Sequence, residues 1–539
     1  MAPVRPSESY PDQSWSGWGD PSLVPELPEQ VRSLLAAGLG VTHTPGTPGP
    51  ISSIGLPDGR LTDDAADALR GVVDAEGALA DHDSRVRHTR GKSTPDLLRL
   101  RSGDASAAPD LVLLPSSHEQ VVELLEVCSE RRIAVVPFGG GSSVVGGLEP
   151  EAGGFAGLVA LDLRRMNAML ELDAVSRVAV LEPGLRGPEA EALLSERGYT
   201  IGHFPQSFEY ATLGGFAAAR SSGQASAGYG RFDEMVVELR VATPAGTLSM
   251  GRAPKSAAGP DLRQLVLGSE GAFGVITSLS VAVRPAPAVR VYEGWRFGSF
   301  DEGVAALRRL AQDGPRPTVL RLSDETETAL NLARPAEIGG DGGSGGCIAI
   351  IGYEGTAEDV EVRRTGATRV LADAGATEEA GAGETWEHGR YRGPYLRDAL
   401  LDAGALVETL ETVTFWSRVP DLYAAVSSAL QDSLTAAGTP PVILCHVSHV
   451  YPAGASLYFT VAAAQSEDPI AQWVAAKAAA SDAILAAGGS ITHHHGVGTD
   501  HRAWYAREIG ELGVDVLSAV KATLDPAGIM NPGVLLPLP

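Results

Sequence analysis

The chain has 539 residues, of which 44% are hydrophobic and 20% are charged, and its formal net charge is −25 at pH 7. This length exceeds one ordinary core, so two or three globular domains are expected. The negative charge excludes nucleic acid as a partner and opposes docking on an anionic bilayer, and an anionic ligand needs aimed backbone N–H groups or a few well-placed arginines.

The first half of the chain predicts an arm followed by an α+β domain. Residues 1–60 are rich in Pro, Gly and Ser and predict an irregular arm, and the Ala-rich segment 63–83 predicts a helix. Strands and helices then follow one another up to about residue 287. Strands are predicted over 111–114, 133–136, 157–163, 178–181, 236–243, 247–250 and 275–283, and helices over 118–131 and 187–197.

The second half predicts an antiparallel sheet backed by helices. The region 375–420 is predicted to be helical, its Leu/Val-rich neighbourhood at 400–440 offers either a tunnel wall or a dimer surface, and 339–346 predicts a surface loop. Strands are predicted over 292–297, 319–322, 347–353, 442–450 and 455–463, and helices over 301–312, 357–374, 420–437, 470–487 and 501–523. The predicted units are 1–104, 105–287, 288–490 and 491–539.

Cysteine usage and the chain ends favour a cytoplasmic protein. Cys128, Cys347 and Cys445 are far apart and each lies in apolar sequence, so no disulfide framework is expected. No apolar run approaches the roughly 20 residues of a membrane span. The N-terminus lacks the apolar region of a signal peptide, and the C-terminus is not a peroxisomal signal.

A glycine-rich loop at 137–147 follows the predicted strand 133–136 directly. Successive glycines let backbone N–H groups converge on an oxyanion. The loop lacks the Lys-Ser/Thr of a Walker A motif, and Val144 occupies a position where a dinucleotide fingerprint needs glycine. Either the loop holds a nucleotide pyrophosphate or it is only a tight turn. Further glycine clusters at 214–215, 228–230 and 268–274 favour one extended ligand that passes close to the backbone.

These segments resemble the FAD-binding domain of the vanillyl-alcohol oxidase (p-cresol methylhydroxylase, PCMH) superfamily over about 109–285, and 524–533 is similar to the ending of many such flavoproteins. The resemblance implies an α+β fold with a PCMH-type FAD-binding domain and a substrate (cap) domain. FAD is expected to be non-covalent, because no His or Cys in these loops is an evident covalent tether and His203 is only the nearest candidate. The residues implied to line FAD are Pro137, Phe138, Gly139, Gly140, Gly141, Ser142, Ser143, Gln206, Ser207, Phe208, Glu209, Tyr210, Ala211, Thr212, Ala219, Arg220, Ser221, Ser222, Glu270, Gly271, Ala272, Phe273, Gly274, Val275 and Ile276.

Three adjacent histidines, His493, His494 and His495, precede a Gly-Val-Gly turn. Histidine is the side chain that exchanges protons near neutrality. A metal site is disfavoured because consecutive side chains point in different directions and no CxxC or HExxH spacing is present. A surface histidine patch is the other interpretation.

Within the superfamily the chain is most similar to the alkyldihydroxyacetonephosphate synthases, in segments 15–19, 202–209, 395–398, 453–459 and 493–495. The predicted strand 455–463 places Tyr458 on a polar face, although a structural tyrosine is the alternative. Arg397 and Arg321 also match. For Arg397 the alternative is an ion pair with Asp398 or Glu408, and for Arg321 it is a structural ion pair.

The resemblance implies a reaction in which FAD is an electrophile. A base in the histidine run removes a proton beside the carbonyl of acyl-dihydroxyacetone phosphate, the carbon is captured at flavin N5, carboxylate departs, and a fatty alcohol takes its place. Tyr458 is implied as the acid/base or carboxylate-contact residue, and Arg397 and Arg321 as substrate contacts. The expected partners are a lipid substrate and a second copy of the chain, and the protein is expected to make peripheral contact with a membrane.

Two departures from the synthases leave other functions open. Segment 224–227 stands where synthases carry a Lys-Lys pair, and 499–502 replaces a basic stretch. Both changes remove positive charge that could meet a substrate phosphate. A flavin-dependent oxidoreductase acting on a hydroxy acid or alcohol is therefore the alternative. A non-catalytic scaffold is a third interpretation, but Tyr458, Arg397 and all three histidines count against it.

Overall fold

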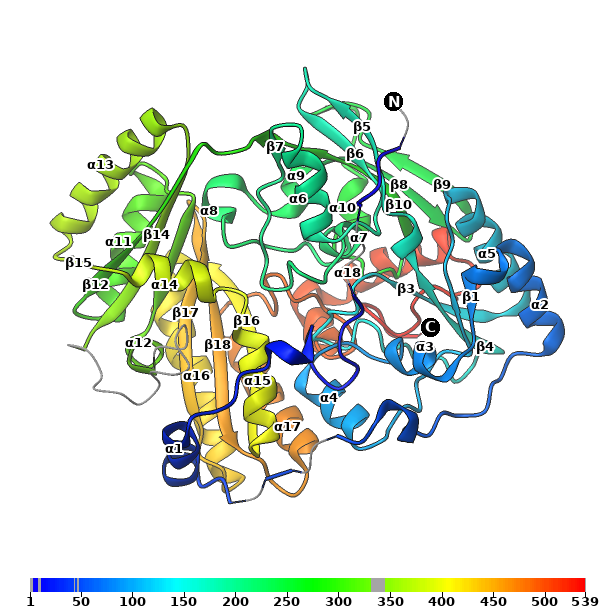
Figure 1. The fold of residues 1–539 in the computed structure, drawn as a ribbon, viewed down its shortest axis with the longest axis horizontal. Coiled ribbons are helices and arrows are strands. Elements are labelled where there is room, and N and C mark those ends of the chain that lie inside the picture. Colours follow the sequence, from blue (N-terminus) through cyan, green and yellow to red (C-terminus); the bar gives the residue numbers. More distant parts are fainter. Residues whose placement is uncertain (1–2, 8–10, 43, 46–47, 331–344, 539) are drawn as a thin grey trace.

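The computed structural model describes residues 3–7, 11–42, 44–45, 48–330 and 345–538. The predicted surface loop at 339–346 lies outside these residues apart from its last two positions. The described strands form four sheets with helices around them, which confirms the α+β class (Figure 1). None of the described helices is both long enough and apolar enough to cross a membrane.

The first half contains a four-stranded sheet and a five-stranded antiparallel sheet joined by one helix. In the first sheet β2, β4 and β3 run parallel, and β1 adds antiparallel to β2. Helix α5 (His118–Arg131) contacts β3 of this sheet and β8 and β10 of the next. The strands are β1 (Ala78–Leu79), β2 (Leu111–Leu113), β3 (Ile133–Phe138) and β4 (Gly157–Asp162), then β5 (Met169–Asp173), β6 (Val178–Leu181), β8 (Val236–Thr243), β9 (Gly246–Met250) and β10 (Val275–Ala282).

The end of the chain returns to β3, the strand that leads into the glycine loop. The Val135 N–H donates to the Ile529 carbonyl at 2.9 Å, and the Asn531 N–H donates to the Val135 carbonyl at 2.8 Å. The Asn531 side chain then donates to the carbonyls of Gly147 and Glu270 at 2.9 and 2.7 Å. The C-terminal segment therefore fixes both the strand and the far end of the glycine loop.

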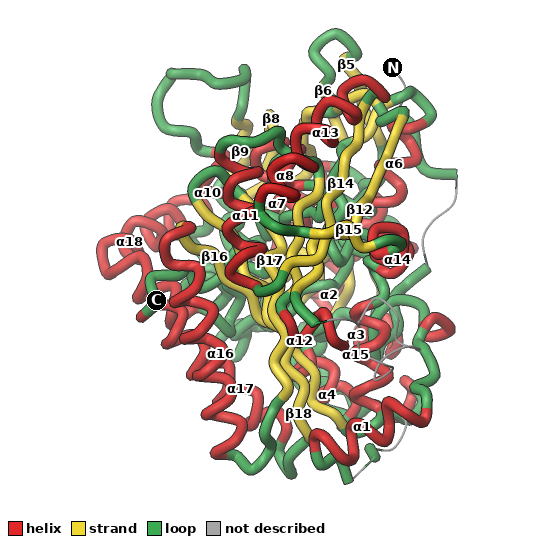
Figure 2. Tube along the Cα trace, turned by 90° about the vertical axis from the view of Figure 1, so that its left-hand side faces the viewer, coloured by secondary structure: helices red, strands yellow, loops and turns green. Residues whose placement is uncertain are grey.

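The second half is a seven-stranded antiparallel sheet in the order β15-β12-β14-β13-β17-β18-β16. One face packs against α11, α13, α16 and α17 in a single core, and the other face packs near β16 and β18 against α1 and α15 (Figure 2). The strands are β12 (Val289–Phe297), β13 (Val319–Ser323), β14 (Cys347–Gly355), β15 (Thr377–Glu379), β16 (Ala405–Phe415), β17 (Val442–Val450) and β18 (Gly454–Ala464). The helices are α1 (Glu29–Leu39), α11 (Phe300–Gln312), α13 (Ala357–Asp373), α15 (Gly393–Asp402), α16 (Val419–Ala436) and α17 (Pro469–Ala486).

Two predictions about the N-terminal region are wrong. The arm contains helix α1, whose apolar residues Val31, Leu35 and Leu39 recur every four positions and are buried. The helix was not predicted because the segments on either side of it are rich in Pro and Gly, which are typical of irregular structure, and the apolar period spans only 11 residues. The predicted helix at 63–83 ends at Val72, and the chain continues into β1 and helix α3 (His82–Arg87).

The predicted helical region 375–420 is also partly wrong, because it contains the 11-residue strand β16. Ten of its eleven residues are buried or half-buried, so the strand lacks the polar alternation that identifies a half-exposed strand. Helices α14 (Ala382–Gly389) and α15 occupy the preceding residues. In the 400–440 region α15 contributes to the cavity described below, whereas α16 packs into the core, with Leu422, Val426 and Leu430 fully buried.

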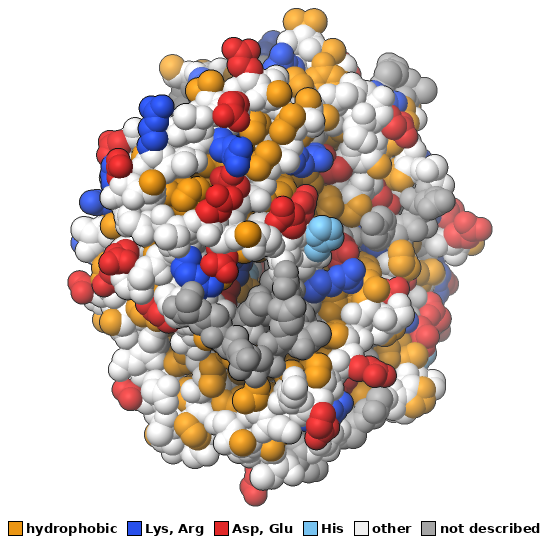
Figure 3. Space-filling view, turned by 60° about the vertical axis from the view of Figure 1, so that its left-hand side comes forward, with side chains coloured by type: hydrophobic (Ala, Val, Ile, Leu, Met, Phe, Trp, Pro, Cys, Tyr) orange, Lys and Arg blue, Asp and Glu red, His pale blue; other side chains and the backbone are white. Residues whose placement is uncertain are grey.

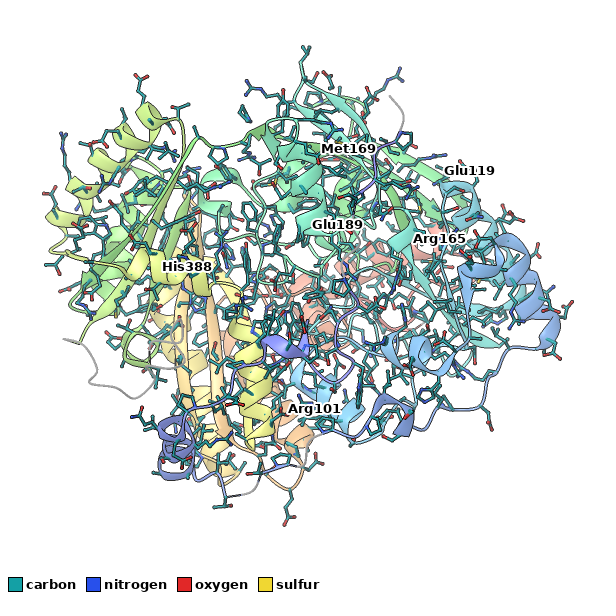
Figure 4. All side chains as sticks on the ribbon, in the orientation of Figure 1. Arg101, Glu119, Arg165, Met169, Glu189 and His388 are labelled. Atoms are coloured by element: carbon teal, nitrogen blue, oxygen red, sulfur yellow. The ribbon has the colours of Figure 1, made fainter. Side chains whose placement is uncertain are left out.

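The N-terminal arm is fastened to helix α15 of the other half. The Trp18 N–H donates to the Asp398 carboxylate at 2.5 Å. Arg101, at the end of α4 (Thr94–Arg101) and labelled in Figure 4, donates to the Ser16 carbonyl at 2.7 Å and pairs with Asp402 at 3.0 Å. The arm thus holds the two halves together on this side. Acidic and basic side chains are interspersed over the face seen in Figure 3.

Candidate active site

A cavity of about 1150 Å³ lies between the glycine loop and the seven-stranded sheet. Its lining has two chemical parts. The polar part combines backbone of the glycine loop with Lys92, Arg321, Arg397, His446, His449, Tyr458, His494 and His495. The apolar part comes from α1, α12 (Glu325–Leu330), α15 and the sheet and includes Val31, Leu34, Leu35, Leu39, Leu330, Leu396, Leu400, Val442, Leu444 and Ala462.

The glycine loop lines the cavity with backbone rather than side chains. A Cβ on Gly140 would lie 1.9 Å from the Tyr210 carbonyl oxygen, and one on Gly139 would lie 2.4 Å from the Thr212 hydroxyl. The N–H groups of 140–143 donate to no other described residue. Unpaired donors in a loop with no room for side chains suit a phosphate oxyanion, so these residues fit the pyrophosphate of FAD.

Most residues predicted to contact FAD line this cavity. They are Pro137, Phe138, Gly139, Gly140, Gly141, Ser142, Ser143, Gln206, Ser207, Ala211, Thr212, Ala219, Ser221, Ser222, Glu270, Gly271, Gly274 and Ile276. Seven others are not part of the lining: Phe208, Glu209, Tyr210, Arg220, Ala272, Phe273 and Val275. The run 137–143 lines the cavity throughout, whereas each of the other three runs alternates between the cavity and the packing behind it. Ala272 and Phe273, for example, join an apolar cluster with Val497 and Val534.

The positions of the glycines at 228–230 and of His203 bear on two further expectations about the cofactor region. The glycines at 228–230 do not line the cavity, and Gly228 packs against the backbone of Thr318 instead. His203, the nearest candidate for a covalent tether, is buried against Phe216 and Phe232 and pairs with the Ser221 hydroxyl at 3.0 Å. This position is consistent with non-covalent FAD.

The histidine run is held from one side by Glu411, a buried carboxylate on β16. One of its oxygens accepts from the Thr492 hydroxyl at 2.6 Å and from the N–H groups of His494 and His495 at 3.0 and 2.9 Å. The other oxygen accepts from the His493 N–H at 2.6 Å. Sequence reasoning missed Glu411 because β16 was predicted to be helical. This one carboxylate fixes the backbone of all three histidines.

Glu270 holds the same loop from the side of the glycine loop. Its carboxylate accepts from the N–H groups of Val497 and Gly498, both at 2.8 Å. Gly498 has a φ of +56°, and a Cβ there would lie 1.8 Å from the Val145 carbonyl oxygen. Gly496, at φ +92°, would direct a Cβ into the Glu270 carboxylate at 2.6 Å. The Gly-Val-Gly turn is therefore required for this close approach.

Burial sets the protonation of the polar groups. It lowers the pKa of His495 to about 3 and lowers the pKa of His493 and His494 as well, so the three imidazoles are neutral near pH 7. Burial alone would raise the pKa of Glu411, but the positive charge that the neighbouring imidazoles take up in acid, together with the hydrogen bond from Thr492, holds that pKa well below its usual value. Burial raises the pKa of Tyr458 to about 12, so its phenol stays protonated.

Tyr458 faces the cavity, as the predicted alternation required. Its neighbours Leu457 and Phe459 are fully buried in the core on the opposite face of β18. The phenol ring stacks on His446 with centroids 4.9 Å apart and meets His495 edge-on at 5.6 Å. The tyrosine and the histidine run therefore share one wall of the cavity.

Both predicted arginines line the cavity and both are ion-paired. Arg397 pairs with Asp398 at 2.9 Å and donates to the Lys92 carbonyl at 2.5 Å. Arg321 pairs with Glu327 and contacts His446 Nδ1 at 3.1 Å. The ion pairs that were weighed as alternatives are present, and they orient each guanidinium at the cavity wall.

His446 and His449 are cavity residues that the sequence prediction missed. Both lie on β17, and two positions three apart on a regular strand would face opposite sides. A break in register between Val447 and His449 lets both histidines reach the cavity. The extra residue, Ser448, lines the cavity between them.

Comparison with known proteins places these features in a family. The family model for "FAD binding domain" matches residues 109–250, and that for "FAD linked oxidases, C-terminal domain" matches 286–535. The alkyldihydroxyacetonephosphate synthase of Dictyostelium discoideum is 36% identical over 84% of this chain and 77% of its own length. That of Trypanosoma brucei brucei is 33% identical over 99% and 94%. A solved alkyldihydroxyacetonephosphate synthase structure superposes with a TM-score of 0.82 at 31% identity, covering 97% of this chain and 99% of that one.

Proposed function

Because the chain belongs to the alkyldihydroxyacetonephosphate synthase family of FAD-dependent enzymes, we propose that it exchanges the acyl group of an acyl-dihydroxyacetone phosphate for a fatty alcohol. The observation that carries the proposal is a single cavity in which the glycine loop, the histidine run, Tyr458 and an apolar lining meet. Such a cavity suits a substrate that carries a charged group at one end and a hydrocarbon chain at the other.

The apolar lining supports binding of the chain of the substrate. Each methylene that it removes from water contributes about 0.8 kcal/mol. Leu34 on α1 both lines the cavity and is 44% exposed, so the apolar part reaches the surface at this helix. Leu23 is exposed nearby in sequence. We propose peripheral membrane contact at α1 on this basis. Separately, the exposed Leu512 and Val516 of α18 (Arg502–Leu524) are the surface that we propose for a homodimer.

Five cationic side chains in the described part of the chain line the cavity, and three of them, Lys92, Arg390 and Arg397, support binding of the phosphate. The other two are Arg296 and Arg321. Arg390 pairs with no acidic side chain among the described residues, and its guanidinium lies 5.0 Å from the Tyr391 ring centroid. Burial lowers the pKa of Lys92 to about 7, so a bound phosphate dianion would favour its charged form. These cations compensate for the basic residues that the segments 224–227 and 499–502 lack.

The proton transfer is assigned to His494 or His495, and the contact with the departing carboxylate to Tyr458. One neutral imidazole accepts the proton from the carbon beside the substrate carbonyl and returns it to that carbon at the end of the exchange. The protonated phenol of Tyr458 donates a hydrogen bond to the carboxylate, which leaves as the anion. When FAD is bound along the glycine loop, its oxidised ring supplies an electrophilic centre for the substrate carbon. Glu411 keeps the histidines in place, and the buried cavity keeps water from the reacting atoms.

The low pKa of the histidines predicts the pH dependence of turnover. A base with a pKa below its usual 6.5 stays neutral and active down to a correspondingly lower pH, so the acidic limb of kcat should lie below pH 6.5. Measuring kcat rather than kcat/KM removes the titration of the free substrate phosphate. A limb at or above pH 6.5 would contradict the assignment.

An anaerobic spectroscopic experiment tests the proposal. The purified yellow protein is mixed with palmitoyl-dihydroxyacetone phosphate, the flavin spectrum is followed, and hexadecanol is then added. We expect bleaching without net reduction, followed by recovery of colour and formation of the alkyl product. An unchanged spectrum, with reduction by a hydroxy acid or alcohol instead, would replace the exchange reaction by the oxidoreductase alternative.

A further inference from the structure

Three histidines from two separate segments converge beside the cavity. His449 comes from β17, and His493 and His494 come from the loop before α18. One ring nitrogen of each lies within 4.8 Å of the others, and the Nδ1 atoms of His493 and His494 are 3.0 Å apart. Nitrogen atoms about 2.0–2.1 Å from a shared tetrahedral ion lie about 3.4 Å apart. The 3.0 Å pair is close to this spacing, and the 4.8 Å limit on the third nitrogen leaves at most about 1.4 Å to be closed when an ion binds. Of the three consecutive histidines, His493 and His494 belong to this cluster and His495 does not.

His449 carries a nitrogen that the protein itself does not satisfy. The residue is only 6% exposed, so its Nδ1 is shielded from solvent, yet this atom has no hydrogen-bond partner among the described residues. By contrast, His493 Nε2 pairs with the Tyr451 hydroxyl at 2.7 Å. Most buried polar atoms are paired, so an orphan imidazole nitrogen next to two other imidazoles indicates a missing partner.

The surroundings suit a cation. Glu411, a buried carboxylate, lies 3.7 Å from His494 Nδ1 and supplies negative charge outside the three nitrogens. The positive charge of Arg231 acts on all three histidines and opposes a cation.

We propose that His449, His493 and His494 bind one transition-metal dication of the zinc class, with its fourth coordination position open toward the cavity. Three protein ligands and one open position are a common arrangement for zinc, and His449 and His494 both line the cavity. A bound ion occupies nitrogen lone pairs of the histidine run, so it also inhibits the exchange reaction. The inhibition rests on the proposed function, whereas the binding does not.

The binding is tested on the flavin-loaded protein after chelator treatment and gel filtration. Calorimetric titration with Zn²⁺ should give one tight site per chain, and Co²⁺ should give tetrahedral absorption bands at longer wavelengths than the flavin. His449→Gln should weaken Zn²⁺ binding by about 100-fold or more, since it removes a direct ligand. His388→Gln is the matched control, because His388 is exposed on α14 (Figure 4) and lies outside the cluster.

Flavin content and melting temperature show whether each variant is folded. If His449→Gln does not fold, His494→Gln provides a second variant that lacks one ligand. Equal Zn²⁺ affinity in the wild type and in a folded ligand variant would overturn the site, as would the absence of a stoichiometric site in the wild type. One equivalent of Zn²⁺ should stop the exchange, and chelator should restore it. Zn²⁺ binding without inhibition would overturn only the inhibitory role of the ion. If the protein has no exchange activity, the proposed function fails, and the Zn²⁺ titrations alone decide whether the metal site exists.

Discussion

Replacing Tyr458 by Phe should lower kcat for the exchange by about 10²- to 10³-fold, the range for loss of one positioned hydrogen-bond donor to a developing negative charge. The substitution removes only the hydroxyl, so the stacking of the ring on His446 and its edge contact with His495 remain. The pKa of about 12 keeps this phenol protonated at working pH, and a protonated group can donate to a departing carboxylate. Steady-state kinetics at saturating substrate measure the effect, and KM should change much less than kcat.

Tyr423→Phe is the matched control. It removes a hydroxyl that donates to the Asp324 carboxylate at 3.1 Å on the core side of the sheet, outside the cavity lining. We expect a modest loss of stability, about 1 kcal/mol, and nearly unchanged kcat. Equal losses of kcat in the two variants would show that Tyr458 acts only through packing.

Replacing Glu411 by Ala should lower the free energy of unfolding by about 3 to 5 kcal/mol. The change strands the donors of the loop, three backbone N–H groups and the Thr492 hydroxyl, in a buried place where water cannot replace the carboxylate. Released from its anchor, the histidine run should also lose its alignment with Tyr458, so kcat should fall as well. Denaturant unfolding of the flavin-loaded protein measures the first effect.

Glu508→Gln is the control, because this exposed carboxylate also holds the start of the loop, through Ser490 and Ile491. This substitution should lower the free energy of unfolding by less than about 1 kcal/mol.

The pH dependence of stability gives an independent check on Glu411. The pKa of Glu411 is lowered in the folded state, so its contribution is present above the unfolded pKa of about 4.3 and is lost as the pH falls further. The stability gap between wild type and Glu411→Gln should therefore narrow below that pH.

Local patterns predicted several of the strands and helices that frame the site, among them β3, β17 and β18. The alternation along β18 placed Tyr458 on the cavity side, and the glycine loop after β3 was recognised by its composition. Both depend on neighbours in sequence, through the two-residue period of a strand and the freedom of glycine. The family resemblance then supplied FAD, which pattern alone had left as one of two interpretations of the loop.

Features that depend on distant parts of the chain were not predictable in this way. Glu411 was missed because β16 is covered on both faces, so its sequence shows no polar alternation. His449 reaches the cavity only through the break in strand register at Ser448, which no local signal marks. Helix α1 becomes part of the cavity wall because it packs against a sheet more than 350 residues away in the chain. In each case tertiary packing decides the role of the residue.

The double attachment of the histidine loop limits how this protein can be recombined. The loop is held by Glu411 on the seven-stranded sheet and by Glu270 beside the glycine loop, and the C-terminal Asn531 reaches back to the same region. A chimaera that exchanges substrate specificity by cutting once near residue 286 would pair a foreign loop with the native Glu270. Swapped units must therefore carry the glutamate, the turn that it holds and the C-terminal segment together, so these parts are expected to change in concert as the family diversifies.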